Sequence, residues 1–180
     1  MNVIDTKIND VKIIEPVVFG DHRGFFMETF EKNRYQEMLD IDYDFVQDNY
    51  SRSVKGVLRG LHFQRNNPQG KLVRVVRGEV FDVAVDIRKD SPTYGKWEAI
   101  VLSEDNKKQF WIPPGLAHGF LVLSDIADLE YKCTSYYDPS SEQCLSWEDE
   151  IVNIKWPDLN VPLRLSEKDK AGKKLHELLP

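Results

Sequence analysis

Cysteine is scarce in this sequence, and long apolar runs are missing. Cys133 and Cys144 are the only cysteines among 180 residues, which argues against a disulfide framework and a thiolate metal site. No segment approaches the roughly 18 apolar residues that a membrane-spanning helix needs. The N-terminal residues lack the basic-then-apolar pattern of a signal peptide, so we expect a cytoplasmic protein that does not associate with membranes.

Positive charge is also in short supply. The chain has 24 lysines and arginines against 30 acidic residues, and its net charge is −6. Nucleic-acid binding needs a basic face, so it is not expected here. An anionic ligand would require cations concentrated in one place, which makes the position of each arginine and lysine informative.

Two signatures of nucleotide-binding parallel sheets are missing as well: strand–helix alternation and a glycine-rich phosphate loop. Short strands separated by Gly/Pro turns recur at a spacing of about 8–12 residues, which predicts an antiparallel sandwich or barrel. The clearest strands are residues 71–77, 80–88, 97–102 and 127–137. With no linker or repeat in view, we expect a single domain spanning residues 1–180.

Three further elements are predicted near the ends of the chain. Residues 11–18 resemble an edge strand, because Pro16 cannot donate to a ladder. Residues 31–39 should form a short helix. The tail, at about residues 166–179, should be helical too, since Ser166-Glu-Lys-Asp169 has the form of a capping box.

The most informative stretch is residues 56–64, Gly-Val-Leu-Arg-Gly-Leu-His-Phe-Gln. It predicts a strand, interrupted by Gly60, that holds Arg59 close to His62. A neutral imidazole can accept a proton near pH 7, and a guanidinium can hold a diphosphate. The same residues also fit a strand with one structural histidine and one solvated arginine.

The spacing of Arg59 and His62 leaves their orientation open. Three positions apart, they would point to opposite faces of an unbroken strand. Gly60 could host a bulge that re-aims one of them. Alternatively, Arg59 could reach phosphate at the mouth of a cavity while His62 points inside.

Polar residues on otherwise apolar strands predict a ligand cavity inside the barrel. Two histidines, a tyrosine and a lysine among them suit proton transfer, while no Ser–His or Cys–His nucleophile pair stands out. The candidates are Arg23, Glu28, Gln47, Asn49, Arg59, His62, Lys71, His118 and Tyr131.

A metal site is the first alternative. Residues 113–118, Pro-Pro-Gly-Leu-Ala-His, fit the second metal-binding motif of cupin barrels. The first motif needs His-x-His, but the strand offers only His62-Phe63-Gln64. His62 and His118 alone cannot supply a three-histidine site, so no metal is predicted.

Taken together, the motifs resemble the dTDP-4-dehydrorhamnose 3,5-epimerase family. The resemblance runs in family order from about residue 10 to residue 170, and the block at 57–64 is its most specific part. It implies a cupin-like, double-stranded jelly-roll β-barrel and a homodimer that exchanges N-terminal strands. The matching segments are 21–28, 45–51, 57–64, 70–74, 81–86, 113–120, 136–139 with Glu142, and 165–169.

The family resemblance also implies an activity. It is the cofactor-independent epimerisation of dTDP-4-dehydro-6-deoxy-D-glucose at C3 and C5 to dTDP-4-dehydro-L-rhamnose, through an enolate, in dTDP-L-rhamnose biosynthesis. His62 falls on the position of the base, Tyr131 on that of the acid and Asp169 on that of the partner of the base, while Lys71 and His118 are the candidates for stabilising the enolate. The implied substrate-binding positions are Arg23, Phe26, Glu28, Gln47, Asp48, Asn49, Arg59, His118, Tyr137, Glu142 and Lys168.

Three other functions stay open at this point. The chain could be an epimerase of a related dTDP-4-keto sugar that acts at C3 or C5 alone. It could be a cupin that binds a sugar nucleotide without catalysis, or a metal-dependent cupin oxygenase. Exchange of substrate hydrogens with solvent separates the first two possibilities from the favoured one.

Overall fold

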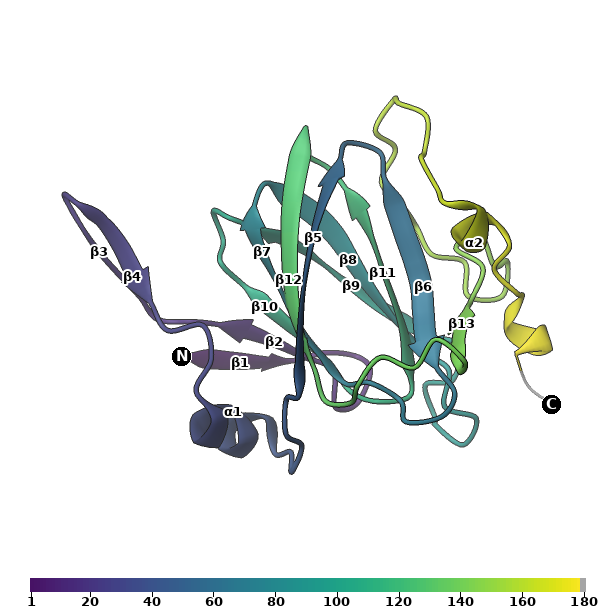
Figure 1. Cartoon of the computed structure of the whole chain (residues 1–180), viewed down its shortest axis with the longest axis horizontal. Coiled ribbons are helices and arrows are strands. Elements are labelled where there is room, and N and C mark those ends of the chain that lie inside the picture. The colour runs from purple at the N-terminus through teal and green to yellow at the C-terminus, as the bar shows by residue number, and fades with distance from the viewer. Residues whose placement is uncertain (179–180) are drawn as a thin grey trace.

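Residues 1–178 are described in the computed structural model, in which two antiparallel sheets pack face to face as a jelly-roll barrel (Figure 1). The predicted all-β fold is therefore confirmed. The six-stranded sheet contains, in spatial order, β1 (Asn2–Asp5), β2 (Lys12–Glu15), β10 (Gln109–Ile112), β7 (Lys71–Arg77), β12 (Ile126–Cys133) and β5 (Gln47–Val54). The five-stranded sheet contains β13 (Glu142–Cys144), β6 (Leu58–Gln64), β11 (Leu116–Val122), β8 (Glu79–Asp86) and β9 (Trp97–Ser103).

The main hydrophobic core lies between the two sheets. Alternation along β8 shows how it forms: Ala84 faces this core, while Val83 and Val85 face a second cluster on the outer side of the sheet. Burying one large apolar side chain contributes about 1.5–3 kcal/mol. The inner core includes Val73, Phe110 and Leu129 from the six-stranded sheet and Val80, Phe120 and Val122 from the other.

A third cluster lies on the outer face of the six-stranded sheet, beneath α1 (Lys32–Leu39). Tyr35 and Leu39, one turn apart on the helix, are buried in one cluster with Trp111. The hydroxyl of Tyr35 donates to Gln109 Oε1 at 2.9 Å, so the buried phenol has a partner. The helix predicted at residues 31–39 is confirmed. No helix among residues 1–178 is long and apolar enough to cross a membrane.

The hairpin of β3 (Val18–Asp21) and β4 (Gly24–Met27) pairs only with itself and extends away from the barrel (Figure 1). Phe19, Phe25 and Phe26 are 64%, 60% and 70% exposed on it. An apolar surface of this kind usually marks an interaction site.

The prediction of an edge strand at residues 11–18 is wrong. Within that range β2 pairs with β1 on one side and with β10 on the other, so it is an interior strand. Pro16 lies just beyond the last residue of β2, where its missing N–H costs no ladder hydrogen bond. Pairing with residues about 95 positions away decides this arrangement, and no local pattern reports it.

The C-terminal tail contains two short helical segments rather than one continuous helix. They are α2 (Glu167–Lys170) and the 3₁₀-helix η1 (Leu175–Glu177). Between them the chain runs beside the end of β13, and a Cβ on Gly172 would lie 2.8 Å from Ser146 Cα. The backbone therefore approaches too closely for a side chain. Leu179, the last residue of the tail predicted to be helical, lies outside the described residues.

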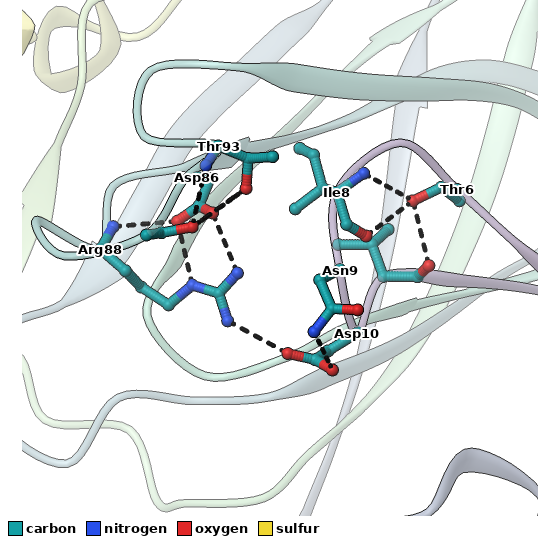
Figure 2. Close-up of polar contacts among 9 residues, drawn as sticks. Thr6, Ile8, Asn9, Asp10, Asp86, Arg88 and Thr93 are labelled. Atoms are coloured by element: carbon teal, nitrogen blue, oxygen red, sulfur yellow. Dashed lines mark hydrogen bonds and ion pairs between the residues drawn. The ribbon is translucent and has the colours of Figure 1, made fainter.

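The buried carboxylate of Asp86 holds Arg88, and Arg88 connects the turn between β8 and β9 to the N-terminal loop. Asp86 accepts hydrogen bonds from Arg88 Nε and Nη2 at 3.0 and 2.9 Å and from Thr93 Oγ1 at 2.6 Å (Figure 2). Arg88 also reaches Asp10 Oδ2 at 3.5 Å. Burial opposes ionisation, but these donors outweigh it and lower the pKa of Asp86 to about 2.

Candidate active site

A cavity of about 280 Å³ opens between the two sheets. His62 enters it from β6 of the five-stranded sheet, and Tyr131 enters it from β12 of the six-stranded sheet. The imidazole and the phenol therefore lie on opposing walls. The predicted site residues that line this cavity are Gln47, Asn49, His62, Lys71, Tyr131, Tyr137 and Glu142.

A β-bulge sets the direction of His62. Across β6 and β11, His62 pairs with His118 and Arg59 with Phe120, so β6 carries one extra residue. Gly60 lies there with φ +109°, and a Cβ on it would be 2.6 Å from the backbone of His118. Only glycine fits this conformation and this contact. The bulge, one of the two arrangements predicted, is confirmed.

The bulge turns both Arg59 and His62 toward the six-stranded sheet, but the two side chains differ in exposure. Arg59 is exposed, and its Nε donates to Ser53 Oγ at 3.0 Å. His62 is partly buried on the cavity wall. Arg59 is close enough to Tyr131 to oppose the rise in the pKa of that phenol. An arginine in this position can hold an anionic group near the cavity.

Asp169, from α2, lies directly behind His62. His62 Nε2 is 2.6 Å from Asp169 Oδ1, and the N–H of Gly60 donates to the same oxygen at 3.2 Å. Burial opposes the ionised form, but the hydrogen bonds from His62 and Ser166 lower the pKa of Asp169 to about 2. An ionised Asp169 must accept the proton of Nε2, which leaves Nδ1 of a neutral imidazole free to accept another.

Tyr131 and Lys71 occupy the opposite wall. Burial raises the pKa of Tyr131 to about 12, so its hydroxyl keeps its proton at neutral pH. Burial also lowers the pKa of Lys71, whose Nζ lies 6.0 Å from the centre of the Tyr131 ring. The wall thus combines a protonated phenol with a desolvated amine, and both can donate to an oxygen in the cavity.

His118 is buried beside Tyr131, with ring centres 6.4 Å apart, and is not among the residues that line the cavity. Its Nε2 lies 2.9 and 3.1 Å from the two carboxylate oxygens of Asp82. Burial lowers the pKa of His118, which favours the neutral ring. Sequence reasoning missed Asp82; the only signal was a charged residue at an inward position of an apolar strand.

A polar network crosses the mouth of the cavity. The hydroxyl of Tyr137 donates to Glu142 Oε2 at 2.7 Å, and Lys168 forms an ion pair with the same carboxylate. Gln47 accepts the backbone N–H of Tyr137 at 2.8 Å. Burial favours the neutral acid, but Lys168 and Tyr137 lower the pKa of Glu142. These groups form a partly charged rim suited to a polar ligand.

Four predicted binding residues lie away from this cavity within the same chain. Arg23 and Phe26 are on the projecting hairpin, where Arg23 pairs with Asp21. Glu28 forms an ion pair with Arg34, and Asp48 forms one with Lys132 at 2.9 Å. None of the four lines the cavity that contains His62.

One cluster in the described part of the chain offers three metal-ligand atoms within 4.8 Å of one another: His62, Cys144 and Asp169. The nitrogen of His62 and the oxygen of Asp169 already bond each other. Burial raises the pKa of the Cys144 thiol to about 12, so the thiolate that would bind metal is disfavoured. The donor set does not fit a resident metal ion.

Fold and cavity together define a class. A two-sheet barrel with an imidazole on one cavity wall and a phenol on the other is a cupin-type barrel suited to proton transfer. Comparison with known proteins identifies the family within this class.

The family model described as dTDP-4-dehydrorhamnose 3,5-epimerase matches residues 5–177. A protein of that name from Salmonella typhimurium is 56% identical over 180 residues, which cover 99% of this chain and 98% of that one. Another from Neisseria gonorrhoeae is 58% identical over 173 residues, 96% of this chain, and this chain spans about half (52%) of its length.

A solved structure gives the same result. The crystal structure of dTDP-6-deoxy-D-glucose-3,5-epimerase from Legionella pneumophila, in complex with dTDP-4-keto-L-rhamnose, superposes with a TM-score of 0.96. It is 57% identical, and the match covers 99% of this chain and 97% of that one. This chain belongs to the dTDP-4-dehydrorhamnose 3,5-epimerase family.

Proposed function

We propose that this protein epimerises dTDP-4-dehydro-6-deoxy-D-glucose at C3 and C5 to dTDP-4-dehydro-L-rhamnose, as a step of dTDP-L-rhamnose biosynthesis in the cytoplasm. The observation that carries the proposal is the opposition of His62 and Tyr131 across one cavity, with Asp169 behind the imidazole. The named relatives support the substrate class.

The chemistry follows from the ketone at C4, which acidifies the hydrogens at C3 and C5. His62 Nδ1 removes one of these protons, and the electron pair moves into an enolate. Lys71 donates to the enolate oxygen, where the negative charge develops. Tyr131 returns a proton from the opposite face, which inverts the carbon. Each such proton transfer contributes typically about 10²–10⁴ in rate.

After each inversion, His62 releases its extra proton to solvent and Tyr131 regains a proton from solvent. Substrate and product have the same oxidation state, so the reaction balances with no redox cofactor. Asp169 stabilises the imidazolium that forms in between, as in other His–carboxylate pairs.

Substrate binding is assigned to the cations and polar groups at the cavity. Arg59 and Lys168 supply positive charge for the diphosphate in a chain whose net charge is −6. Tyr137, with Glu142 at the rim, offers an aromatic face and polar contacts for the nucleotide. Gln47 and Asn49 complete the binding set at the cavity, while His118, which the resemblance also implies, lies behind Tyr131.

We also propose that the active protein is a homodimer in which N-terminal strands are exchanged. The phenylalanines of the β3–β4 hairpin support this, because all three remain largely exposed in their own chain. Arg23 and Phe26 lie on that hairpin, away from their own cavity. Inserted beside a second copy, they would contribute to its substrate site, and Glu28 and Asp48 would lie near the interface.

Incubation of the protein with the proposed substrate in D₂O tests the function. Deuterium is expected at both C3 and C5, and His62→Ala should abolish this exchange. His176→Ala, which removes an exposed imidazole outside the cavity, is the matched control and should exchange normally. Label at one carbon only would indicate a single-centre epimerase, and binding without exchange would indicate a non-catalytic sugar-nucleotide cupin.

A further inference from the structure

Ser166, the residue before α2, holds Asp169 by two hydrogen bonds. Its hydroxyl donates to Asp169 Oδ2 at 2.6 Å and accepts the backbone N–H of Asp169 at 3.2 Å. Its backbone is extended, with φ −71° and ψ 162°, as at a helix N-cap. The Ser166 hydroxyl therefore bonds both the carboxylate and the backbone N–H of Asp169, which fixes the direction of the carboxylate.

The Asp169 side chain points in a different direction from the corresponding side chain of a capping box. In a capping box the side chain three residues after the cap turns back to the cap's backbone N–H. Asp169 has that position, but its Oδ1 instead faces His62 and the N–H of Gly60. Within residues 1–178, Ser166 is the only hydrogen-bond donor to Oδ2. Asp169 is only 4% exposed, so solvent is a poor substitute.

We propose that Ser166 is a positioning residue for proton transfer: its hydroxyl holds the Asp169 carboxylate against His62, so that Nδ1 of the imidazole is aimed into the cavity. This inference rests on the proposed function and adds a third member to the His62–Asp169 pair. Without the hydroxyl, a buried carboxylate oxygen loses its donor, which disfavours the ionised and aligned carboxylate.

Loss of the Ser166 hydroxyl should weaken the stabilisation of the imidazolium formed during the reaction. An Asp169 that has turned away or taken up a proton no longer stabilises the positive charge on His62. His62 then becomes a weaker base and accepts the substrate proton less readily. The other titratable groups facing the pair are Glu142 and Cys144 from β13, Lys168 from α2 and His118 from β11. A substitution at Ser166 leaves all of these in place.

Two variants separate positioning from helix capping. Ser166→Ala removes both the donor and the acceptor. Ser166→Asp keeps a good N-cap acceptor for the backbone N–H but offers no proton to Asp169 at neutral pH. Ser166→Thr keeps both functions. The matched control is Ser103→Ala, because Ser103 Oγ also accepts an N–H three residues on, from Asn106 at 3.0 Å, but touches no carboxylate.

If Ser166 positions Asp169, Ser166→Ala and Ser166→Asp should both lower kcat by about tenfold or more, with KM within about twofold. In Ser166→Ala the acid limb of the kcat/KM profile should move to lower pH, because the loss of the hydroxyl weakens the negative charge that Asp169 presents to the base. Ser166→Thr should restore both, and Ser103→Ala should match the unmodified protein. Melting temperatures measured alongside identify any variant that is not folded.

Wild-type kcat in Ser166→Asp would overturn the inference, since capping alone would then explain the contact. Wild-type kcat with an unmoved acid limb in Ser166→Ala would overturn it as well. Either outcome differs from failure of the proposed function. In the latter case the unmodified protein itself would show no exchange of C3 or C5 hydrogens.

Discussion

Replacing Asp169 by asparagine removes the negative charge behind His62 and keeps the size of the side chain. Burial alone would raise the pKa of this carboxyl, yet the hydrogen bonds of the site bring it from 3.8 to about 2. At about 1.4 kcal/mol per pKa unit, the surroundings favour the carboxylate by about 2 kcal/mol. Because Asp169 is nearly fully buried, little of this is lost to solvent screening.

His62 makes the largest of the favourable contributions to this shift, and the same contact stabilises the imidazolium. Its loss should therefore slow proton abstraction by up to roughly 30-fold. A second effect adds to this. An asparagine amide can donate to Nε2, which would favour the tautomer with the proton on Nδ1, the nitrogen that must accept the substrate proton. In other His–Asp pairs, replacing the aspartate by asparagine lowers kcat strongly because the histidine adopts the wrong tautomer. We expect a total loss of roughly 10²–10⁴-fold.

The assay is the initial rate of deuterium incorporation at C3 and at C5, per mole of folded protein. The matched control is Asp128→Asn. Asp128 is also buried, and Arg52 lowers its pKa to about 2, but it does not line the cavity. The control should exchange at the normal rate even if it melts earlier. Exchange by Asp169→Asn within about threefold of the unmodified protein at both carbons would refute the assigned role.

Three more outcomes are expected. Tyr131→Phe should still wash deuterium into the substrate while losing inversion, because His62 would return the proton to the face from which it came; unchanged turnover would remove Tyr131 as the acid. The depressed pKa of Asp86 gives stability that is fully present above about pH 4 and is lost as the pH falls toward 2, so Asp86→Asn should flatten the acid side of a melting-temperature profile by an amount equivalent to about 2 kcal/mol. Replacing Phe25 and Phe26 by aspartate should shift gel-filtration elution from dimer to monomer, and a monomer volume for the unmodified protein would contradict the proposed exchange.

Local patterns predicted the strands well where polar and apolar residues alternate or where glycine marks a turn. The strand at residues 71–77 matches β7 residue for residue, because Gly70 and Gly78 flank it. The bulge was also open to prediction, since Arg59 and His62 could not share a face without one. In each case a backbone rule acts within a few residues.

Elements that depend on distant partners were harder to predict. Residues 11–18 contain a proline that suggests an edge, but β10 decides the position of β2. The contact between His62 and Asp169 joins residues 107 positions apart, and only the family resemblance pointed to it. Ser166 was visible as a cap, but its contact with the carboxylate depends on where the tail meets β6.

The buried amine of Lys71 shows how the fold would favour the enolate over the ketone. Burial lowers the pKa of this lysine, so its ammonium form is poorly stabilised before the reaction begins. A neutral carbonyl oxygen stabilises that ammonium only weakly. An enolate oxygen carries a negative charge and stabilises it strongly in a site with little water. The interaction is therefore stronger in the transition state than with bound substrate, and only such differential interactions speed the chemical step. A fully exposed cation cannot act in this way, because solvent already stabilises its charge.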